Sequence, residues 1–98
     1  MSKVRVIARG KAKKGQESAV RELLQSLVEP TRREEGCIKY ELLQGTTDPA
    51  DFVMAEEWAS EAALDAHLEK PDVVAVLQKL GHFLATAPEI ARYRLLTR

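Results

Sequence analysis

Apolar and polar side chains alternate along several segments of the chain, and alternation with period two is typical of β-strands that bury one face. In the first segment, Val4, Val6 and Ala8 alternate with basic residues. Strands are predicted over residues 4–12, 37–44, 52–59 and 89–97. Turn-forming residues separate the second and third strands, so these two are expected to form a hairpin.

Between the strands, apolar residues recur every three or four positions, which is the spacing of one face of a helix. This pattern predicts a first helix over residues 16–35. A second helix is expected to begin after Ser60, a residue type that caps helices well, and to carry His67 on its apolar face. Pro71 is expected to start a third helix, whose apolar stripe continues to Leu84 and which should end near residues 87–88.

The order β-α-β-β-α-β predicts a ferredoxin-like α+β fold, an antiparallel sheet with helices on one face, and residues 1–98 are expected to form a single domain. The other face of the sheet is left without helices. The alternation assigns charged and apolar residues to this uncovered face: Arg5, Ile7, Arg9, Lys39, Leu43, Arg92 and Arg94. Such a face can be hydrated, can bind nucleic acid or can pack on a second copy of the chain.

Charge and composition narrow the classes of function. The 98 residues include 15 Lys and Arg and 15 Asp and Glu, so no overall field favours nucleic acid or an anionic membrane. The basic sheet face also lacks the aromatic side chains on which sheets of this topology stack RNA bases. Neither nucleic acid nor a membrane is therefore expected as a partner. With a single cysteine, no secretory signal and no run of about 20 apolar residues, a cytoplasmic location is expected.

The third predicted strand carries the only tryptophan of the chain. By alternation, one face of this strand presents Phe52, Met54, Glu56 and Trp58 to the helices. Trp58 either fills the core or forms the wall of a cavity for a planar molecule. A carboxylate that faces a core needs a partner, and His67 on the following helix is the candidate partner of Glu56.

Histidine and tyrosine side chains supply the groups that could move a proton or bind a ligand. His67 is a candidate base for a phenolic or enolic proton, and the alternative is a hydrogen-bonded histidine of the core. His82, next to Phe83, is a second candidate. Tyr40 and Tyr93 are assigned to the apolar face, where each hydroxyl would bond an internal acceptor or a ligand oxygen. Two separate histidines without clustered ligands do not specify a metal site, and none is expected.

Two stretches of the sequence resemble the signature regions of the antibiotic biosynthesis monooxygenase domain family. They are EEGCIKYEL at residues 34–42 and EEWASEAALDAHL at residues 56–68. The chain length, the order of elements and the hairpin turn agree with this family, so the resemblance covers essentially the whole chain. It implies a dimeric α+β barrel, in which two ferredoxin-like subunits pack sheet against sheet as a homodimer.

The resemblance also implies a chemistry. Members of the family include enzymes that oxygenate quinols or polycyclic anthrones with O2 and without flavin or metal, which implies a cofactor-independent monooxygenase for a small planar aromatic substrate. On matching positions, Trp58 would wall the cavity, His67 would act as base and Glu56 would orient it. The residues expected to contact the substrate are Phe52, Met54, Tyr40, Tyr93, His82 and Phe83. No cofactor is expected.

Other functions stay open at this point. Haem-degrading relatives use an asparagine on the first strand, and the corresponding position here is Ala8, flanked by Arg9, which argues against haem degradation. One alternative is an isomerase or lyase acting on an enolisable metabolite, in which His67 moves protons and O2 is not consumed. Another is a non-catalytic module that binds a small ligand or takes part in a stress response.

Overall fold

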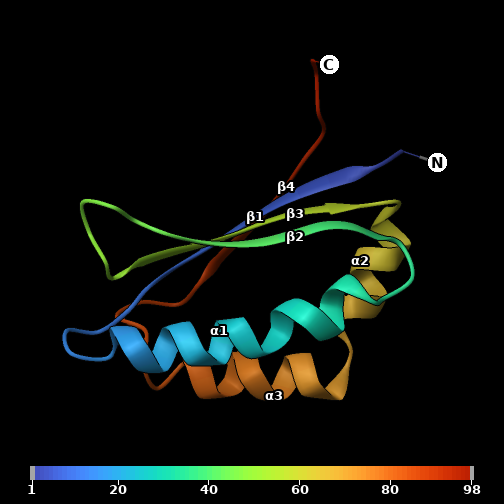
Figure 1. The fold of residues 1–98 in the computed structure, drawn as a ribbon. Helices are drawn as coiled ribbons and strands as arrows, with labels where there is room; N and C mark the ends of the chain where they lie inside the picture. Colours follow the sequence, from blue (N-terminus) through green and yellow to red (C-terminus); the bar gives the residue numbers. More distant parts are fainter. Residues whose placement is uncertain (1, 98) are drawn as a thin grey trace.

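The computed structural model describes residues 2–97, which form a sheet and a layer of helices (Figure 1). In chain order the elements are β1 (Val4–Lys11), α1 (Glu17–Arg32), β2 (Cys37–Gln44), β3 (Asp51–Trp58), α2 (Glu61–Leu68), α3 (Pro71–Leu80) and β4 (Glu89–Tyr93). The helices lie on one side of the sheet (Figure 1). The other side, called the outer face below, carries no helix within residues 2–97.

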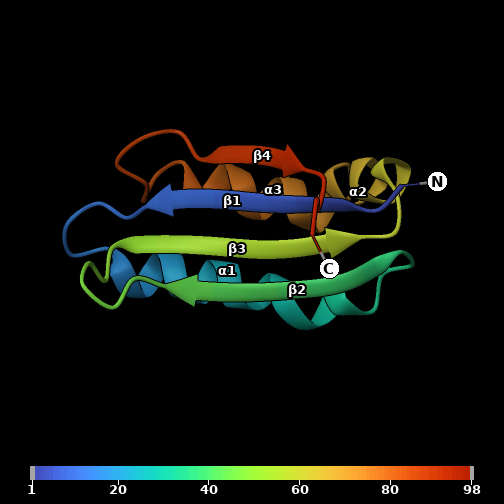
Figure 2. The same cartoon turned by 90° about the horizontal axis from the view of Figure 1, so that it is seen from above.

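The sheet has the strand order β2-β3-β1-β4, and neighbouring strands run antiparallel (Figure 2). The predicted ferredoxin-like α+β fold is therefore confirmed. The hairpin between β2 and β3 also forms as predicted, and its turn is closed by a hydrogen bond from the Gly45 N–H to the carbonyl of Asp51 (2.8 Å). The four strands make an open sheet with β2 and β4 at its edges.

The inner face of β3 forms the centre of the buried layer. Its inward residues Phe52, Met54, Glu56 and Trp58 are each at most 7% exposed, whereas the residues between them are only half-buried. Alternation therefore assigned this face correctly. Glu56 is the exceptional member, because a carboxyl group has been placed among apolar side chains.

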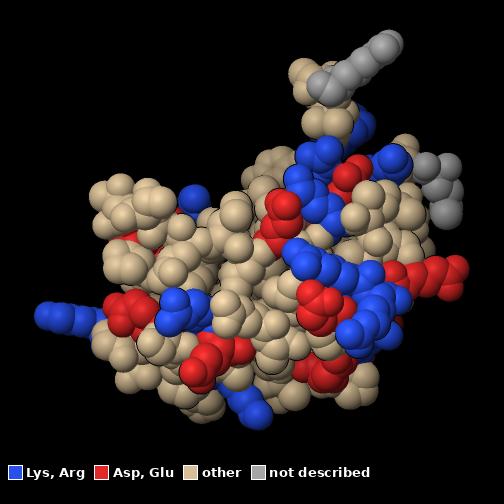
Figure 3. Space-filling view, in the orientation of Figure 1, with Lys and Arg blue, Asp and Glu red and all other residues tan. Residues whose placement is uncertain are grey.

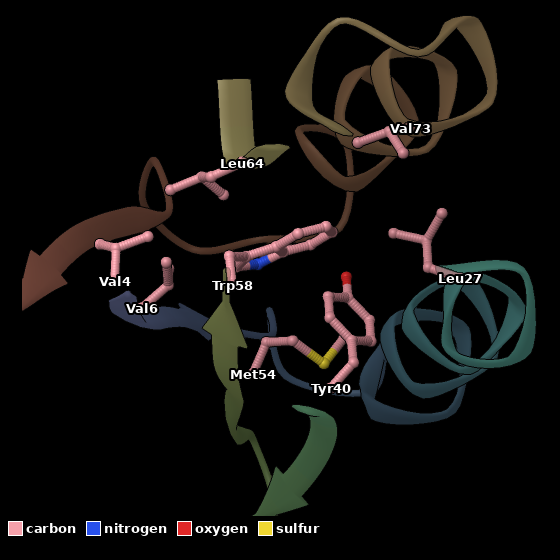
Figure 4. Close-up of a cluster of buried hydrophobic side chains, with 8 residues drawn as sticks. All are labelled: Val4, Val6, Leu27, Tyr40, Met54, Trp58, Leu64 and Val73. Atoms are coloured by element: carbon pink, nitrogen blue, oxygen red, sulfur yellow. The ribbon is translucent and has the colours of Figure 1, made fainter. Parts of the chain in front are cut away.

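Buried apolar side chains form two clusters between the sheet and the helices. The first consists of Val4, Val6, Leu27, Tyr40, Met54, Trp58, Leu64 and Val73 (Figure 4). The second consists of Ala12, Val20, Phe52, Leu80 and Leu84. Leu24, Leu42, Val76 and Leu77 pack against both clusters, so the two form one continuous layer.

The third helix is shorter than its apolar stripe predicts, because α3 ends at Leu80 and not near residues 87–88. Beyond the helix the chain bonds to the end of β1, where the Ala85 N–H donates to the carbonyl of Lys11 (2.7 Å). Leu84, which continues the helical spacing in sequence, is buried by this contact with the strand instead. Tertiary pairing thus overrides the local helical pattern.

The turn between α1 and β2 brings one carboxylate toward α2. α1 ends at Arg32, short of the predicted residue 35, and the turn includes Gly36 at φ +87°, a conformation that glycine adopts without strain. A Cβ atom on Gly36 would lie 2.6 Å from the Cβ of Ala63, so this turn packs closely on α2. The same turn carries Glu34.

β4 is shorter than predicted, and its two faces are opposite to the predicted assignment. Tyr93 pairs with Arg5 on the outer face and is 53% exposed. Arg92 lies on the helix side, where its guanidinium donates to Glu61 (2.9 Å) and Asp65 (2.7 Å) of α2. The assignment was wrong because alternation determines which residues share a face, whereas the acidic partners on α2 decide which face turns inward.

Acidic and basic side chains are interspersed on the face shown in Figure 3. Ion pairs include Lys11 with Asp48 (2.8 Å) and, on the outer face, Arg5 with Glu57 (3.7 Å). In the part of the chain that the structure describes, no helix has the length and apolar character needed to cross a bilayer.

Candidate functional site

The structure brings Trp58 and His67 into contact. Trp58 is the last residue of β3, and His67 lies in the last turn of α2. Their ring centroids are 4.8 Å apart and the ring planes are inclined by 35°. The side chains are 0% and 2% exposed, so the pair belongs to the interior of the protein.

α2 holds His67 in this position through its cap and its buried face. The Ala63 N–H donates to the hydroxyl of Ser60 (3.1 Å), which confirms Ser60 as the N-cap. Leu64 and His67 are the buried residues of this short helix, as predicted from their spacing. The position of His67 is therefore set by a capped helix that packs on the sheet.

Glu34 is the partner of His67, where the sequence analysis expected Glu56. The Nδ1 atom of His67 lies 3.0 and 3.1 Å from the two carboxylate oxygens of Glu34. A carboxylate only accepts hydrogen bonds, so Nδ1 carries a proton, and in the neutral imidazole the lone pair is on Nε2. Sequence reasoning missed Glu34, although it begins the 34–42 motif and precedes the glycine that packs on α2.

Glu56 has a different partner, the indole of Trp58. The Nε1–H of Trp58 donates to Oε1 of Glu56 (2.8 Å) within the core. Burial raises the pKa of Glu56 to about 7, and the negative charge of Glu34 acts in the same direction, while the hydrogen bond from Trp58 opposes both. Glu56 can therefore exchange a proton near neutral pH, which an ordinary glutamate does not do.

Tyr40 completes the polar groups of this region. It is buried, and its ring meets that of His67 edge-on, with centroids 5.7 Å apart and planes inclined by 69°. Burial, together with the charges of Glu56 and Glu34, raises the pKa of the Tyr40 phenol far above its ordinary value. Tyr40 therefore remains a protonated phenol at neutral pH and can donate a hydrogen bond.

A cavity of about 50 Å³ lies beside these groups, between the sheet and helices α1, α2 and α3. Its wall includes Tyr40, Glu56 and His67 together with apolar side chains such as Met54. Trp58 is fully buried behind them, so it supports the wall through its contacts with Glu56 and His67 and does not itself face the cavity. The polar groups are thus gathered at an otherwise apolar hollow.

Four of the residues predicted to contact a substrate do not line this cavity. Phe52 belongs to the second cluster and Phe83 packs against that cluster. His82 is exposed directly after the end of α3, and Tyr93 is on the outer face. The helical and strand spacing predicted an inward position for these residues. His82 is exposed because α3 ends before it, and Tyr93 is exposed because its side of β4 forms part of the outer face.

The described residues do not include a group of three or more His, Cys, Asp or Glu side chains arranged to hold a metal ion. What the cavity does present is the imidazole of His67, whose Nδ1 faces Glu34, a carboxyl group whose pKa is raised to about 7, and a phenol donor. These groups suit the removal and return of protons on a small molecule.

Comparison with protein families gives a match between residues 3–79 and the family described as Antibiotic biosynthesis monooxygenase. Among curated sequences, the chain is 36% identical over 83 residues to "Putative monooxygenase Rv0793" of Mycobacterium tuberculosis, covering 85% of this chain and 81% of that protein. It is also 36% identical over 73 residues to "Uncharacterized protein sll1783" of Synechocystis, covering 74% of this chain. The chain spans only 50% of the length of that second relative.

Solved structures agree with these sequence relationships. The structure of Rv0793 from Mycobacterium tuberculosis superimposes with a TM-score of 0.93 at 31% identity, covering 99% of this chain and 98% of that one. A conserved protein from Methanosarcina mazei superimposes with a TM-score of 0.89 at 34% identity, covering 96% and 93% of the two chains.

Proposed function

The chain belongs to the antibiotic biosynthesis monooxygenase family, and on this premise we propose that it inserts one oxygen atom of O2 into a small planar quinol without an added cofactor. The observation that supports this proposal is the arrangement of His67. Glu34 holds its Nδ1–H, and the ring lines a cavity that also presents Glu56 and Tyr40.

The first step is removal of a phenolic proton by Nε2 of His67. The positive charge that develops on the ring is stabilised by the carboxylate of Glu34. Tyr40, which stays protonated, donates a hydrogen bond to a substrate oxygen and stabilises the resulting anion. Apolar side chains form the rest of the wall and exclude water from the reacting ring.

The substrate supplies all the electrons. The quinol anion passes one electron to O2, and the radical pair forms a carbon–oxygen bond at a ring carbon, giving a hydroperoxide. Loss of the hydrogen from that carbon and cleavage of the O–O bond release water and leave a carbonyl. The balance is one hydroquinone and one O2 giving one hydroxyquinone and one water.

The cavity must widen to admit an aromatic ring. Its volume of about 50 Å³ is enough for a few water molecules, whereas a cavity that holds benzene is roughly three times larger. Met54 lies in the wall, and the flexible thioether side chain can adopt several rotamers without strain. Movement of Met54 is the least costly way to make room.

Oxygen uptake tests the proposal. The purified protein is supplied with hydroquinone, methylhydroquinone and naphthohydroquinone, and we expect uptake above the buffer rate with one oxygen atom from ¹⁸O2 in the product. His67→Gln should lower kcat by about 10²-fold or more. His82→Gln, at an exposed histidine, should leave kcat unchanged. Uptake that equals the buffer rate with every quinol would overturn the proposal.

A second candidate is an isomerase or lyase, which the presence of two proton acceptors on one cavity wall favours. His67 and Glu56 would then remove and return a proton on an enolisable carbon. Hydrogen–deuterium exchange into the substrate without O2 distinguishes this chemistry from oxygenation.

We also propose that two copies of the chain associate through the outer face of the sheet. Three large apolar side chains are exposed there, Ile7 (38%), Leu43 (51%) and Tyr93 (53%). They alternate with paired charges such as Arg5 and Glu57, which would remain neutralised in an interface.

A further inference from the structure

A second cavity adjoins the first along the inner face of β1. It also has a volume of about 50 Å³, and it lies toward the Phe52 end of β3. The two cavities share wall residues: Ala8, Leu24, Met54, Leu77 and Ile90. The two cavities therefore lie side by side, and together they are called the groove below.

The two ends of this groove differ in polarity. The first cavity presents Tyr40, Glu56 and His67. The second is apolar, with Phe52 and Leu84 in its wall. Arg9 also contributes to that wall, but its guanidinium pairs with Asp51 (3.5 Å). The groove therefore has a polar end and an apolar end.

The inner face of the sheet is less completely buried at β1 and β4 than at β3. Figure 1 shows α3 farther from the sheet than α1, and Figure 2 places α3 beneath β4 and β1. The inward residues on these strands are small or accessible: Ala8 is half-buried and Ile90 is 43% exposed. At Gly10, an added Cβ would lie 3.2 Å from the Cδ2 of Leu84, so a larger side chain there would displace Leu84, another wall residue of the apolar end.

We propose that the substrate is a quinol carrying an apolar chain, with its ring at Tyr40, Glu56 and His67 and its chain in the groove beneath β1. This inference rests on the proposed function for the identity of the ring, while the chain site rests on the second cavity alone. Glu56 and Phe52 are four residues apart on β3, so the groove runs for roughly 13 Å along the strand. That length matches a ring with a short alkyl chain, and both cavities must widen to admit them.

Binding without O2 tests the chain site separately from turnover. Dissociation constants for methyl-, n-butyl- and n-hexylhydroquinone are measured anaerobically from the fluorescence of Trp58, the only tryptophan. Each methylene that enters the apolar end should tighten binding by up to about fourfold. Failure of oxygen uptake would count against the proposed function. Equal dissociation constants for the three alkylhydroquinones would count against the site for the alkyl chain.

A variant at Gly10 tests where the alkyl chain of the quinol binds. Gly10→Val fills the apolar end and should remove the advantage of hexyl over methyl, while the affinity for methylhydroquinone stays within about twofold. Lys11→Val, on the same strand but facing outward, should retain the full chain-length dependence. Gly10→Ala provides a milder block if the valine variant does not fold. A chain-length dependence that persists unchanged in the folded Gly10 variants would overturn the proposal, because the chain would then bind elsewhere.

Discussion

The carboxylate of Glu34 lies 3.0 Å from Nδ1 of His67, although the two residues are 33 positions apart. Glu34 stands in the turn before β2, and His67 stands in α2. The contact fixes the histidine tautomer, because the carboxylate can only accept the proton on Nδ1. In the neutral ring the basic nitrogen is then Nε2, which does not face Glu34, and His67 lines the cavity.

Glu34→Gln should lower kcat by about tenfold or more and change KM little. The amide has nearly the same shape, but it lacks the charge that stabilises the imidazolium formed when Nε2 accepts a proton. Steady-state oxygen uptake with the best quinol measures this effect. Nitrogen-15 NMR of the imidazole should also show a mixture of tautomers in the variant.

Glu35→Gln is the matched control, because the neighbouring carboxylate is exposed. It should leave both kcat and the tautomer unchanged. Equal kinetics and equal NMR spectra for Glu34→Gln and the wild type would show that Glu34 has no part in positioning His67.

Glu56→Gln should make the protein more stable at pH 8 and leave its stability unchanged at pH 4. The folded protein holds the proton of Glu56 up to a pKa of about 7, whereas the unfolded chain loses it near the ordinary value of 4.5. Stability of the wild type therefore falls as the pH rises from about 4.5 to about 7, by roughly 3 kcal/mol at most, and then stays level. The amide has no charge to bury and can still accept the hydrogen bond from Trp58.

Urea unfolding at several pH values measures this difference. The free energy of unfolding of the variant minus that of the wild type should grow across the same pH window. Glu41→Gln, at an exposed carboxylate on β2, should give a difference that is small at every pH. A difference that does not change with pH would mean that Glu56 has the same pKa in the folded and the unfolded protein.

The fold could be predicted from the sequence because β3 and α2 each bury one face. Alternation from Phe52 to Trp58 and the helical spacing of Leu64 and His67 both survive in the structure. β4 was assigned wrongly because its inward residues are only Ile90 and Arg92, which do not form a strongly apolar face. A weak pattern leaves the choice of face to contacts with other elements.

The site could be predicted only in part, because periodicity gives the face on which a residue lies and not its partner. Glu56 and His67 could be placed on the same side of the sheet by periodicity, but periodicity contains no information on which carboxylate reaches which ring nitrogen. Glu34 approaches through a tight turn that packs on α2. That contact depends on the three-dimensional path of the chain and was not visible in any local pattern.

Gly36→Ala should destabilise the protein more than Gly15→Ala does. Both glycines have positive φ, +87° and +85°, so alanine costs about 1–2 kcal/mol of backbone strain at either position. At Gly36 the new Cβ would also meet Ala63 at 2.6 Å, whereas nothing lies within 4 Å at Gly15. Overpacking should add about 1–3 kcal/mol, measured by urea unfolding. Equal losses at the two sites would show that the turn before β2 is not held tightly on α2.

Ile7→Glu should convert a dimer into a folded monomer. On the outer face Ile7 pairs with Ala55 of β3 and Ala91 of β4, so its larger side chain projects beyond two alanines at the centre of the proposed interface. A carboxylate buried there without a partner would cost several kcal/mol in the dimer and little in the exposed monomer. Sedimentation velocity at micromolar concentration measures the change, with circular dichroism as the check on folding. Val74→Glu is the matched control, because Val74 on α3 has the same 38% exposure and should leave the dimer intact. A wild-type protein that sediments as a monomer under these conditions would rule out association through this face.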